Sequence, residues 1–423
     1  LIMIEFEIPK VDDPISASDA RIIKVIGVGG GGGNAVAHMY NEGMRDVRFE
    51  VCNTDRIALI DSPVPVRRQL GEEGLGAGSN PAKGREIAEK SLDEISKMFD
   101  DGTRMVFITA GMGGGTGTGA APVIAREAKK AGVLTVGVVT IPFLFEREKR
   151  IDQALDGVEE LSRNVDSLLV INNERLRKIC AINTMIDAFK RADDTLLVAV
   201  KSIVDIITTS MKINPDFNDV KTVLSDGGIA LISYGEAEGP DRVSKAIEEA
   251  ITSPLLSDHD IFNARRILMT ICSSDDKNTL TIPEIDVVNN FMEKFVNENI
   301  QTKFGFAPVP GMGGKVKITI LASGFGKNSL PFASANSKDS DNEAAYSSMS
   351  IDEINRRQAR KAYYYGDKNE RKNGMKRKQR HHVFHFGEDD IDNPWIIETI
   401  AASATYNRTS ETLRKIKEQH EVK

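Results

Sequence analysis

Short apolar runs alternate with glycine-rich or helix-like stretches between residues 21 and 172. Five of the runs are rich in β-branched residues and have the length of a strand: RIIKVIGV, FEVCN, RMVFITA, VLTVGVV and SLLVINN. Strands that alternate with helices usually form a parallel sheet covered by helices, and such sheets hold ligands at the carboxyl ends of their strands. This part of the sequence therefore predicts a Rossmann-like α/β domain.

The longest helix-like pattern runs from Asn183 to about Lys212. Its apolar residues recur at spacings of three and four, which predicts one buried face made of Ile186, Phe189, Leu196, Leu197, Val200, Ile203, Ile207 and Met211. Residues 220–324 then alternate again, as strand, helix, strand, helix and two further strands. We expect the long helix to connect the first domain to a second, smaller α+β domain.

The apolar pattern stops after Gly326. The residues that follow are rich in Asn, Ser, Asp and Lys, which is typical of a flexible linker. The sequence thus predicts six parts: a flexible N-terminal segment (1–20), the Rossmann-like domain (21–182), the central helix (183–212), the second domain (213–326), a disordered linker (327–386) and a tail (387–423).

Composition and charge narrow the class of protein. A chain of 423 residues with 40% hydrophobic content can bury a sizeable core, and its net charge of -7 argues against nucleic acid as the main partner. The three cysteines lie far apart and without metal-ligand spacing, which is typical of a reducing compartment. No secretory signal opens the sequence, and the apolar run that begins at Val133 is shorter than the roughly 20 residues of a membrane span. We therefore expect a cytoplasmic protein without a membrane span.

The first candidate for ligand chemistry is the loop GVGGGGGN, which follows the first predicted strand. Gly27, Gly29 and Gly32 satisfy the pattern G-x-G-x-x-G, and Asp55 ends the next strand, where a ribose-binding acid belongs. A dinucleotide-dependent oxidoreductase is therefore one interpretation. The pattern is weak by itself, because glycine-rich turns hold many kinds of phosphate at helix N-termini.

A second loop, GMGGGTGTG at Gly111–Gly119, changes this picture. It holds six glycines but lacks the Gly-Lys-Ser/Thr ending of a P-loop. Two such loops let two rows of backbone N–H groups face one ligand, which fits a polyphosphate better than a bridged pyrophosphate. Thr116 and Thr118 add hydroxyl groups, and the helix predicted to start near Thr118 adds its positive end.

Six motifs carry a resemblance to a known family: GVGGGGGN, CNTD, GLGAGSNP, GGGTGTG, FLFEREKR and NPDFND. Over about residues 21–326 the chain resembles the tubulin/FtsZ superfamily, and within it the bacterial cell-division GTPases. The resemblance implies a filament protein of the division ring that hydrolyses GTP on polymerisation, with GTP/GDP and Mg2+ as cofactors. It also implies a GTP-binding domain at 21–182, a GTPase-activating domain at 213–326, and a cytoplasmic location at mid-cell beneath the inner membrane.

The resemblance also implies roles for individual residues. The nucleotide-binding set is Gly30, Gly31, Gly32, Gly33, Asn34, Asn53, Asp55, Gly76, Ala77, Gly78, Gly114, Gly115, Thr116, Gly117, Thr118, Glu146, Arg150, Asn173, Phe189 and Asp193. Within this set, the residues of GLGAGSNP approach the γ-phosphate, and Glu146 and Arg150 contact the ribose and phosphates. Asn173 and Asp193 read the guanine and Phe189 stacks on it. A carboxylate selects guanine because adenine offers it no matching pair of donors.

The motif INPDFND places Asn214, Asp216 and Asp219 at the end of the long helix. An N-cap role for Asp219 accounts for one acid but not for both acids and the Asn. Twenty helical residues separate Asp193 from Ile213, or roughly 30 Å, so these acids cannot reach the nucleotide of their own chain. They are expected to act on GTP held by a neighbouring copy, which requires a head-to-tail contact and hence an open filament.

Two further features depart from the family. Pro215 and Asn218 stand where an aliphatic residue and Ala are common, and we expect an altered rate rather than lost activity. In the tail, Asp392, Pro394, Trp395 and Ile396 of EDDIDNPWIIETI are the nearest match to the peptide with which family members dock on membrane-tethering proteins. A filament protein of the same superfamily for plasmid partition or cell shape remains an alternative at this point.

Overall fold

The computed structural model describes residues 22–179, 184–209, 211–252, 261–295, 300–325 and 351–366. Two compact units divide the chain between Arg360 and Lys361. The expected N-terminal segment and tail lie outside the described residues, and so does most of the expected linker.

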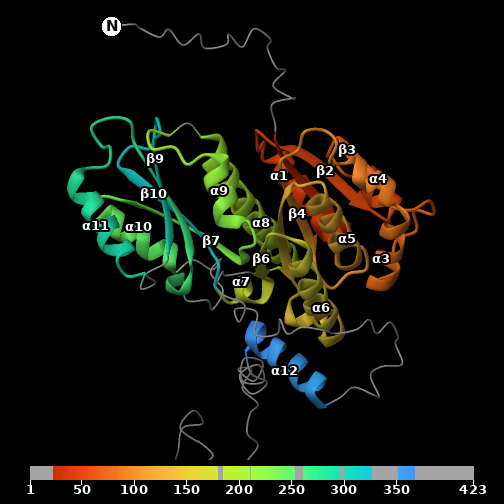
Figure 1. Cartoon of the computed structure of the whole chain (residues 1–423). Coiled ribbons are helices and arrows are strands. Elements are labelled where there is room, and N and C mark those ends of the chain that lie inside the picture. Colours follow the sequence, from red (N-terminus) through yellow and green to blue (C-terminus); the bar gives the residue numbers. More distant parts are fainter. Residues whose placement is uncertain are drawn as a thin grey trace, which may run out of the picture. The chain divides into compact units, whose positions relative to one another are not determined.

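The strands of the first unit form one ten-stranded sheet in the order β3-β2-β1-β4-β5-β6-β7-β10-β8-β9 (Figure 1). Every pairing from β3 to β7 is parallel, which the sequence predicts for the five strands β1, β2, β4, β5 and β6 but not for β3 and β7. These strands are β1 (Ile23–Val28), β2 (Arg48–Asn53), β3 (Val66–Gln69), β4 (Met105–Gly111), β5 (Leu134–Ile141), β6 (Ser167–Asn172) and β7 (Gly228–Glu238). Strands β1, β4 and β5 are buried along almost their whole length, because helices cover a parallel sheet.

The helices that connect these strands carry most of the candidate residues. They are α1 (Gly29–Asn41), α2 (Arg56–Ile60), α3 (Pro81–Lys90), α4 (Leu92–Lys97), α5 (Thr116–Lys130), the 3-10 turn η1 (Leu144–Glu146), α6 (Glu148–Asn164), α7 (Asn173–Ile179) and α8 (Met185–Thr208). Because β1 lies between β2 and β4, the loops that follow these three strands are neighbours at one edge of the sheet.

The second half continues the same sheet with a different pattern. Strand β10 (Lys315–Ser323) is antiparallel to both β7 and β8 (Arg266–Ser273), and β9 (Gln301–Pro308) is parallel to β8. The helical elements of this half are α9 (Phe217–Leu224), α10 (Arg242–Ile251), the 3-10 turn η2 (Ile261–Asn263) and α11 (Ile282–Met292). Within the sheet, the described strands of the two halves are joined by two β6–β7 residue pairs, Ser167 with Gly228 and Leu168 with Ile229.

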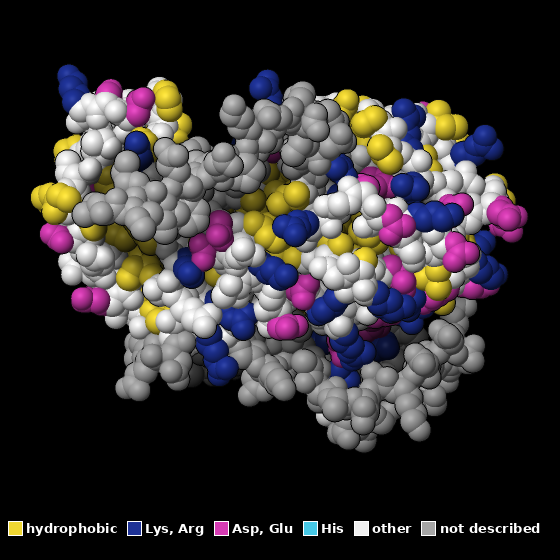
Figure 2. Space-filling view, turned by 45° about the horizontal axis from the view of Figure 1, so that its top comes forward, with side chains coloured by type: hydrophobic (Ala, Val, Ile, Leu, Met, Phe, Trp, Pro, Cys, Tyr) yellow, Lys and Arg dark blue, Asp and Glu magenta, His cyan; other side chains and the backbone are white. Residues whose placement is uncertain are grey.

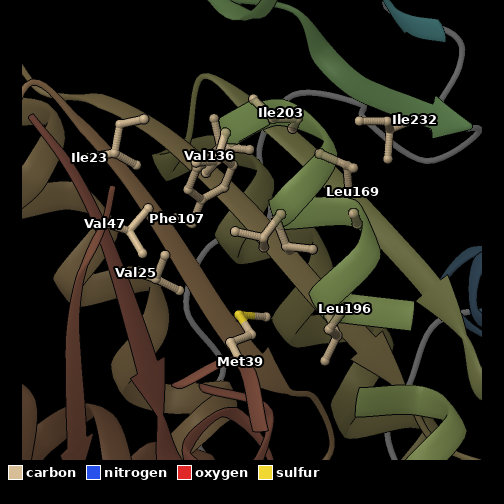
Figure 3. Close-up of a cluster of buried hydrophobic side chains, with 14 of the residues drawn as sticks. Ile23, Val25, Met39, Val47, Phe107, Val136, Leu169, Leu196, Ile203 and Ile232 are labelled. Atoms are coloured by element: carbon tan, nitrogen blue, oxygen red, sulfur yellow. The ribbon is translucent and has the colours of Figure 1, made fainter. Parts of the chain in front are cut away.

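Helix α8 packs against both halves through one apolar cluster (Figure 3). Val25, Phe107, Leu196, Ile203 and Ile232 show how β1, β4, α8 and β7 contribute to it. The predicted apolar face of α8 is confirmed from Leu196 to Ile207, but Ile186 and Phe189 are exposed, and Met211 lies beyond the end of the helix at Thr208. Ile186 and Phe189 belong to the first turns of the helix, ahead of the part that packs in the core.

Helix α12 (Ile351–Tyr365) lies inside the span expected to be a disordered linker, so that expectation is wrong for these residues. Within the first unit, Arg360 pairs with Glu159 at 2.8 Å and with Asp156 at 2.5 Å. The segment is also rich in good helix formers such as Arg, Gln and Ala. The ion pairs of Arg360 and the helix propensity of its neighbours therefore account for the helix formed by this polar segment.

The described surface is mixed in charge. Figure 2 shows Lys and Arg side chains interspersed with Asp and Glu on the face that it presents. No helix within the described part of the chain combines the length and the apolar character that a membrane span requires.

Candidate functional site

The two glycine loops meet where β1 and β4 end. A Cβ atom placed on Gly29 would lie 2.7 Å from the backbone nitrogen of Gly117, and one on Gly31 would lie 3.1 Å from the Cα of Gly111. Such close approach requires glycine on both sides, because any larger residue would force the loops apart. The structure thus brings together the two loops that the sequence analysis linked to one ligand.

The glycines of these loops fall into two groups. Some are closed by packing: a Cβ on Gly32 would lie 2.1 Å from the Thr109 carbonyl oxygen, and one on Gly117 would lie 2.8 Å from that of Gly111. Others face open space, because no atom lies within 4 Å of a Cβ placed on Gly30, Gly33 or Gly114. Packing within the chain does not explain glycine at the open positions, whereas a ligand against the backbone does.

Two helix N-termini point their free N–H groups into this region. Helix α1 begins at Gly29 and α5 begins at Thr116, and neither has a side chain that caps its first turn. Uncapped N–H groups and the positive end of the helix dipole form a binding site for anions. Helix α5 begins two residues earlier than the sequence predicted, so Thr116 and Thr118 both belong to its first turn.

The threonines hold the second loop in shape. Gly113 donates its backbone N–H to the Thr118 hydroxyl oxygen at 2.8 Å, and the hydroxyl groups of Thr116 and Thr54 lie 2.6 Å apart. All three threonine side chains are buried. Thr54 belongs to the CNTD motif, but its role was missed because the sequence does not show which loop it will face.

The motifs CNTD and GLGAGSNP pair with each other. The N–H of Gly76 donates to the Thr54 carbonyl at 2.9 Å, and a Cβ on Gly115 would lie 2.8 Å from the Cβ of Ala77. Gly76 has a left-handed backbone with φ of 80°, which favours glycine. The third motif is therefore packed directly against the second glycine loop.

Asp55 and Asn53 act locally in this structure. The Asp55 carboxylate accepts from the N–H of Ile57 at 2.9 Å and caps α2, and the Asn53 side chain accepts from the N–H of Asp55 at 3.2 Å. Asn34 lies exposed in α1, one residue beyond the open Gly33. These contacts leave the expected nucleotide roles of the three residues as predictions.

Glu146 and Arg150 lie next to the second glycine loop. A Cβ on Gly113 would approach the Arg150 carbonyl oxygen to 2.7 Å, and Arg150 pairs with Glu146 at 3.2 Å. The Glu146 carboxylate also accepts from the N–H of Phe143 at 2.9 Å, which fixes the turn before α6. The Arg150 side chain is half exposed and remains accessible to a ligand.

The predicted base-binding residues lie on linked elements. Phe189 of α8 makes an edge contact with Phe143, and the next residue, Leu144, donates its N–H to Glu174 of α7 at 3.1 Å. Asn173 begins α7 and is buried, and its Oδ1 has no hydrogen-bond partner among the described residues. An orphaned acceptor in a buried amide is costly and points to a ligand with a donor.

Burial raises the pKa of Asp193 to about 6, an effect that nearby His38 opposes and Asp194 reinforces. His38 of α1 and Asp194 of α8 lie 2.8 Å apart, which ties the helix that follows the first glycine loop to the helix that carries Asp193. A partly buried carboxyl group without a hydrogen-bonded counter-ion gains most from a ligand that donates to it.

The acid loop, defined as residues 213–219, lies far from this site. The Asp193–Thr208 part of α8 spans about 22 Å, and β4 and β9 are six strand spacings apart, or roughly 29 Å. The loop pairs with β9 through the N–H of Phe306, which donates to Ile213 at 2.9 Å. The structure thus separates Asp216 and Asp219 from the glycine loops of their own chain.

The structure corrects one step of the sequence analysis. Asp216, not Asp219, is the N-cap of α9: it accepts from the N–H of Asp219 at 2.9 Å, while Asp219 accepts from the N–H of Asp216 at 3.2 Å. This reciprocal capping box accounts for both acids, so capping cannot be set aside as an explanation. Asn214 is exposed and takes no part in the cap.

Lys303 of β9 forms an ion pair with Asp219 of the acid loop. Its ammonium group lies 2.7 Å from Asp219 Oδ1 and holds the pKa of that carboxyl group below its usual range. The sequence does not reveal this contact, because Lys303 lies 84 positions away from Asp219 along the chain. The predicted docking residues Asp392, Pro394, Trp395 and Ile396 lie outside the described residues.

Fold and site together define a nucleotide-binding protein of the tubulin type. Residues 22–181 match the sequence profile of the tubulin/FtsZ family, GTPase domain, and residues 228–326 match that of the FtsZ family, C-terminal domain. Residues 378–423 match a further profile described as FtsZ, C-terminal. The chain therefore belongs to the FtsZ family.

Relatives and solved structures agree with this assignment. The cell division protein FtsZ of Porphyromonas gingivalis is 56% identical over 308 residues, which cover 72% of this chain and 67% of that protein. For the Coxiella burnetii FtsZ the identity is 46% over 310 residues, with 72% and 79% covered. An empty FtsZ dimer from M. jannaschii matches with a TM-score of 0.65 and 38% identity over 73% of this chain and 88% of that one.

Proposed function

We propose that this chain is a GTPase of bacterial cell division that assembles head to tail into filaments. Each copy holds GTP in its glycine loops, and Asp216 and Asp219 of the neighbouring copy complete the hydrolytic site. The observation that carries this proposal is that β4, which leads into the second glycine loop, and β9, on which the acid loop rests, lie six strands apart in one sheet, or roughly 29 Å. Only a second copy brings the two loops together.

Nucleotide binding is supported by the two uncapped helix N-termini and by the open glycines Gly30, Gly33 and Gly114. Guanine selection is supported by Asn173, whose buried Oδ1 has no described partner, and by Asp193. Guanine presents N1–H and an amino group to such acceptors, and adenine does not. GTP and GDP are therefore the proposed ligands.

The head-to-tail contact is supported by exposed apolar side chains beside both parts of the site. Leu75, next to Gly76, is 83% exposed, and Ile213, next to Asn214, is 51% exposed. Large apolar residues that stay exposed beside functional residues are typical of contact surfaces. The M. jannaschii relative was solved as a dimer.

In the proposed reaction, the carboxylates of Asp216 and Asp219 orient a water molecule in line with the γ-phosphate. The backbone N–H groups of the glycine loops hold the phosphates while charge spreads over their oxygens. Asn214, the exposed neighbour of the acids, adds a polar side chain at the same surface. The rate therefore depends on how many contacts between copies are formed.

A Mg2+ ion is also expected from the family. In the part of the chain that the structure describes, no group of three or more His, Cys, Asp or Glu side chains is arranged to hold a metal ion. In nucleotide sites Mg2+ is often held mainly by phosphate oxygens, so the proposed ion does not need such a group. When bound there, Mg2+ offsets negative charge on the phosphates.

The tail is the proposed docking segment for membrane-tethering proteins of the division site. Asp392, Pro394, Trp395 and Ile396 fall within residues 378–423, which match the family profile FtsZ, C-terminal. Docking there would place the filament at mid-cell beneath the inner membrane. Membership of the FtsZ family argues against the alternative of a dinucleotide-dependent oxidoreductase. The relatives named above are cell division proteins, which favours a role in division over one in plasmid partition or cell shape.

GTP turnover against protein concentration tests the shared site. Turnover per subunit should rise above a threshold concentration, and Asp219→Ala should bind GTP but lose about a hundredfold or more in turnover. Glu236→Ala is a matched control, because Glu236 pairs with Lys315 at 2.8 Å on the surface of the same half. Mixing Asp219→Ala with Thr116→Arg should restore some turnover at mixed contacts. Turnover that is independent of concentration would contradict the shared site.

A further inference from the structure

Lys303 has no assigned role in the proposed reaction, yet it touches one of its acids. Its Nζ lies 2.7 Å from Asp219 Oδ1, and the other oxygen of Asp219 accepts from the N–H of Asp216 at 3.2 Å. Both oxygens of the carboxylate are therefore engaged in the free chain. The Lys303 side chain is 46% exposed and that of Asp219 is 25% exposed, so the ion pair lies at the surface.

Strand β9 serves as the platform on which the acid loop rests. Lys212 donates its N–H to the Phe306 carbonyl at 2.8 Å, and Phe306 donates back to Ile213 at 2.9 Å. Gly305 is the residue of β9 just before Phe306. A Cβ placed on it would lie 2.6 Å from the Pro215 ring, so Pro215 packs directly on the strand. Residues 303 and 305 share one face of β9, because side chains alternate along a strand. Lys303 and Gly305 therefore face the acid loop from the same side of the strand, Lys303 at Asp219 and Gly305 at Pro215.

The chemistry of the proposed contact calls for a cation at this place. Asp216 and Asp219 would approach a triphosphate that already carries several negative charges, and like charges repel at short range. A phosphoryl-transfer site commonly includes a basic side chain that offsets this charge. Lys303 is the side chain that supplies a positive charge to the described acid loop through a direct ion pair.

We propose that Lys303 is a positioning residue for the shared site: it fixes Asp219 in the free chain and lowers the negative charge that the acid loop brings to the GTP of a neighbouring copy. This inference rests on the proposed function. It gives β9 a part in hydrolysis in addition to its part in the sheet. It also explains how two acids can dock against phosphates without an arginine in the acid loop.

A second surface ion pair in the same half, between Lys315 and Glu236, provides a control for the Lys303–Asp219 pair. Lys315 and Glu236 lie 2.8 Å apart on β10 and β7, and the Lys315 side chain is exposed to a similar degree as that of Lys303, 51% against 46%. Lys303 is level with Leu321 through the shared partner Leu268, so Lys315 lies six residues, or about 20 Å, away along the sheet. Lys303→Met and Lys315→Met thus remove the same charge at two places, of which only one touches the acid loop.

The measurements are the threshold concentration for GTP turnover, turnover above it, GTP binding below it and thermal unfolding. Lys303→Met should raise the threshold and lower turnover, each by about three- to fivefold, while GTP binding and unfolding stay as in the wild type. Lys303→Arg should keep most of the activity, and Lys303→Glu should lose more than Lys303→Met. Lys315→Met should match the wild type throughout.

Salt distinguishes a charge effect from a structural one. If Lys303 offsets repulsion, the threshold of Lys303→Met should approach that of the wild type as the Debye length is shortened from about 10 Å to about 3 Å. Equal thresholds and turnover for Lys303→Met and Lys315→Met would overturn the role of Lys303 and leave it an edge-strand lysine. If Asp219→Ala also kept full turnover, the shared site itself would be wrong, which separates failure of this inference from failure of the proposed function.

Discussion

The glycine loops and the acid loop differ in what holds them in place. Backbone atoms close the glycine loops so tightly that a single methyl group on Gly32 would lie 2.1 Å from a carbonyl oxygen. The acid loop is held at the surface by a bridge to β9, a capping box and the Lys303 ion pair. The glycine loops are thus fixed by close backbone packing, whereas the acids stand at the surface, as the proposed contact with another copy requires.

The largest expected effect comes from closing the tightest glycine contact. Gly32→Ala should lower the free energy of unfolding by about 3 kcal/mol and abolish GTP binding, because the β1–α1 turn must move away from Thr109. Gly33→Ala is the control: it meets no atom within 4 Å, so stability should be kept while GTP binding weakens. Denaturant unfolding and calorimetric GTP titration measure the two effects. Equal stability of both variants would show that the closed and open glycines do not differ.

A smaller effect is expected from the hydroxyl pair behind the second loop. Thr54→Val keeps the side-chain shape but leaves the buried Thr116 hydroxyl without its partner at 2.6 Å, at a cost of about 1–2 kcal/mol. GTP affinity should fall about tenfold. Thr135→Val removes a hydroxyl that donates to Val133 at 2.9 Å in β5, and it should affect stability but not GTP affinity. A Thr54 variant with wild-type affinity would remove this pair from the binding site.

The pH dependence of GTP binding tests the base-reading end of the site. Asp193 has a raised pKa of about 6 in the free chain, and guanine donors require its ionised form. Below pH 6 the proton must leave before GTP binds, so affinity should fall up to about tenfold per pH unit, and it should be constant above pH 7. Asp193→Asn should bind more weakly and lose this dependence. An unchanged pH profile in that variant would exclude Asp193 as the titrating group.

The smallest effect is expected in the acid loop itself. Pro215→Ala should change turnover by no more than about threefold and lower the free energy of unfolding by about 1 kcal/mol, because the ring contact with Gly305 is lost while the bridge to Phe306 and the capping box remain. GTP binding should not change. A tenfold loss of turnover with normal GTP binding would instead mean that the stiffness of the Asn-Pro turn sets the rate.

Much of the fold follows from local patterns in the sequence. The alternation of apolar runs predicts five of the parallel strands, and the series at 220–324 predicts the order of the second half. Strand β3 was not predicted, because its residues are exposed or partly buried and show no apolar alternation. The β6–β7 pairing that makes one continuous sheet was also missed, since it rests on two residue pairs from distant segments.

In the candidate site, too, local motifs could be predicted from the sequence, but contacts between distant segments could not. Glycine-rich motifs after strands identify the phosphate loops, because their chemistry is written in consecutive residues. The partners that complete the site, such as Thr54 for Thr116, His38 for Asp194 and Lys303 for Asp219, come from contacts across 62, 156 and 84 positions. Such contacts depend on strand order, which no local pattern specifies. The N-cap of α9 was misplaced by three residues because both acids are suitable caps.

The capping box of α9 also bears on how this chain can change over generations. Asp216 and Asp219 hold the start of a helix whose Val220, Val223 and Leu224 lie in the core, so an apolar substitution at either acid loosens that helix as well. Asparagine caps a helix about as well as aspartate, and a single base change converts one to the other. A lineage that gained Asn at position 216 would keep the fold and give up a charge. Folding does not oppose that amide, so any selection against it would have to act on the proposed reaction between copies.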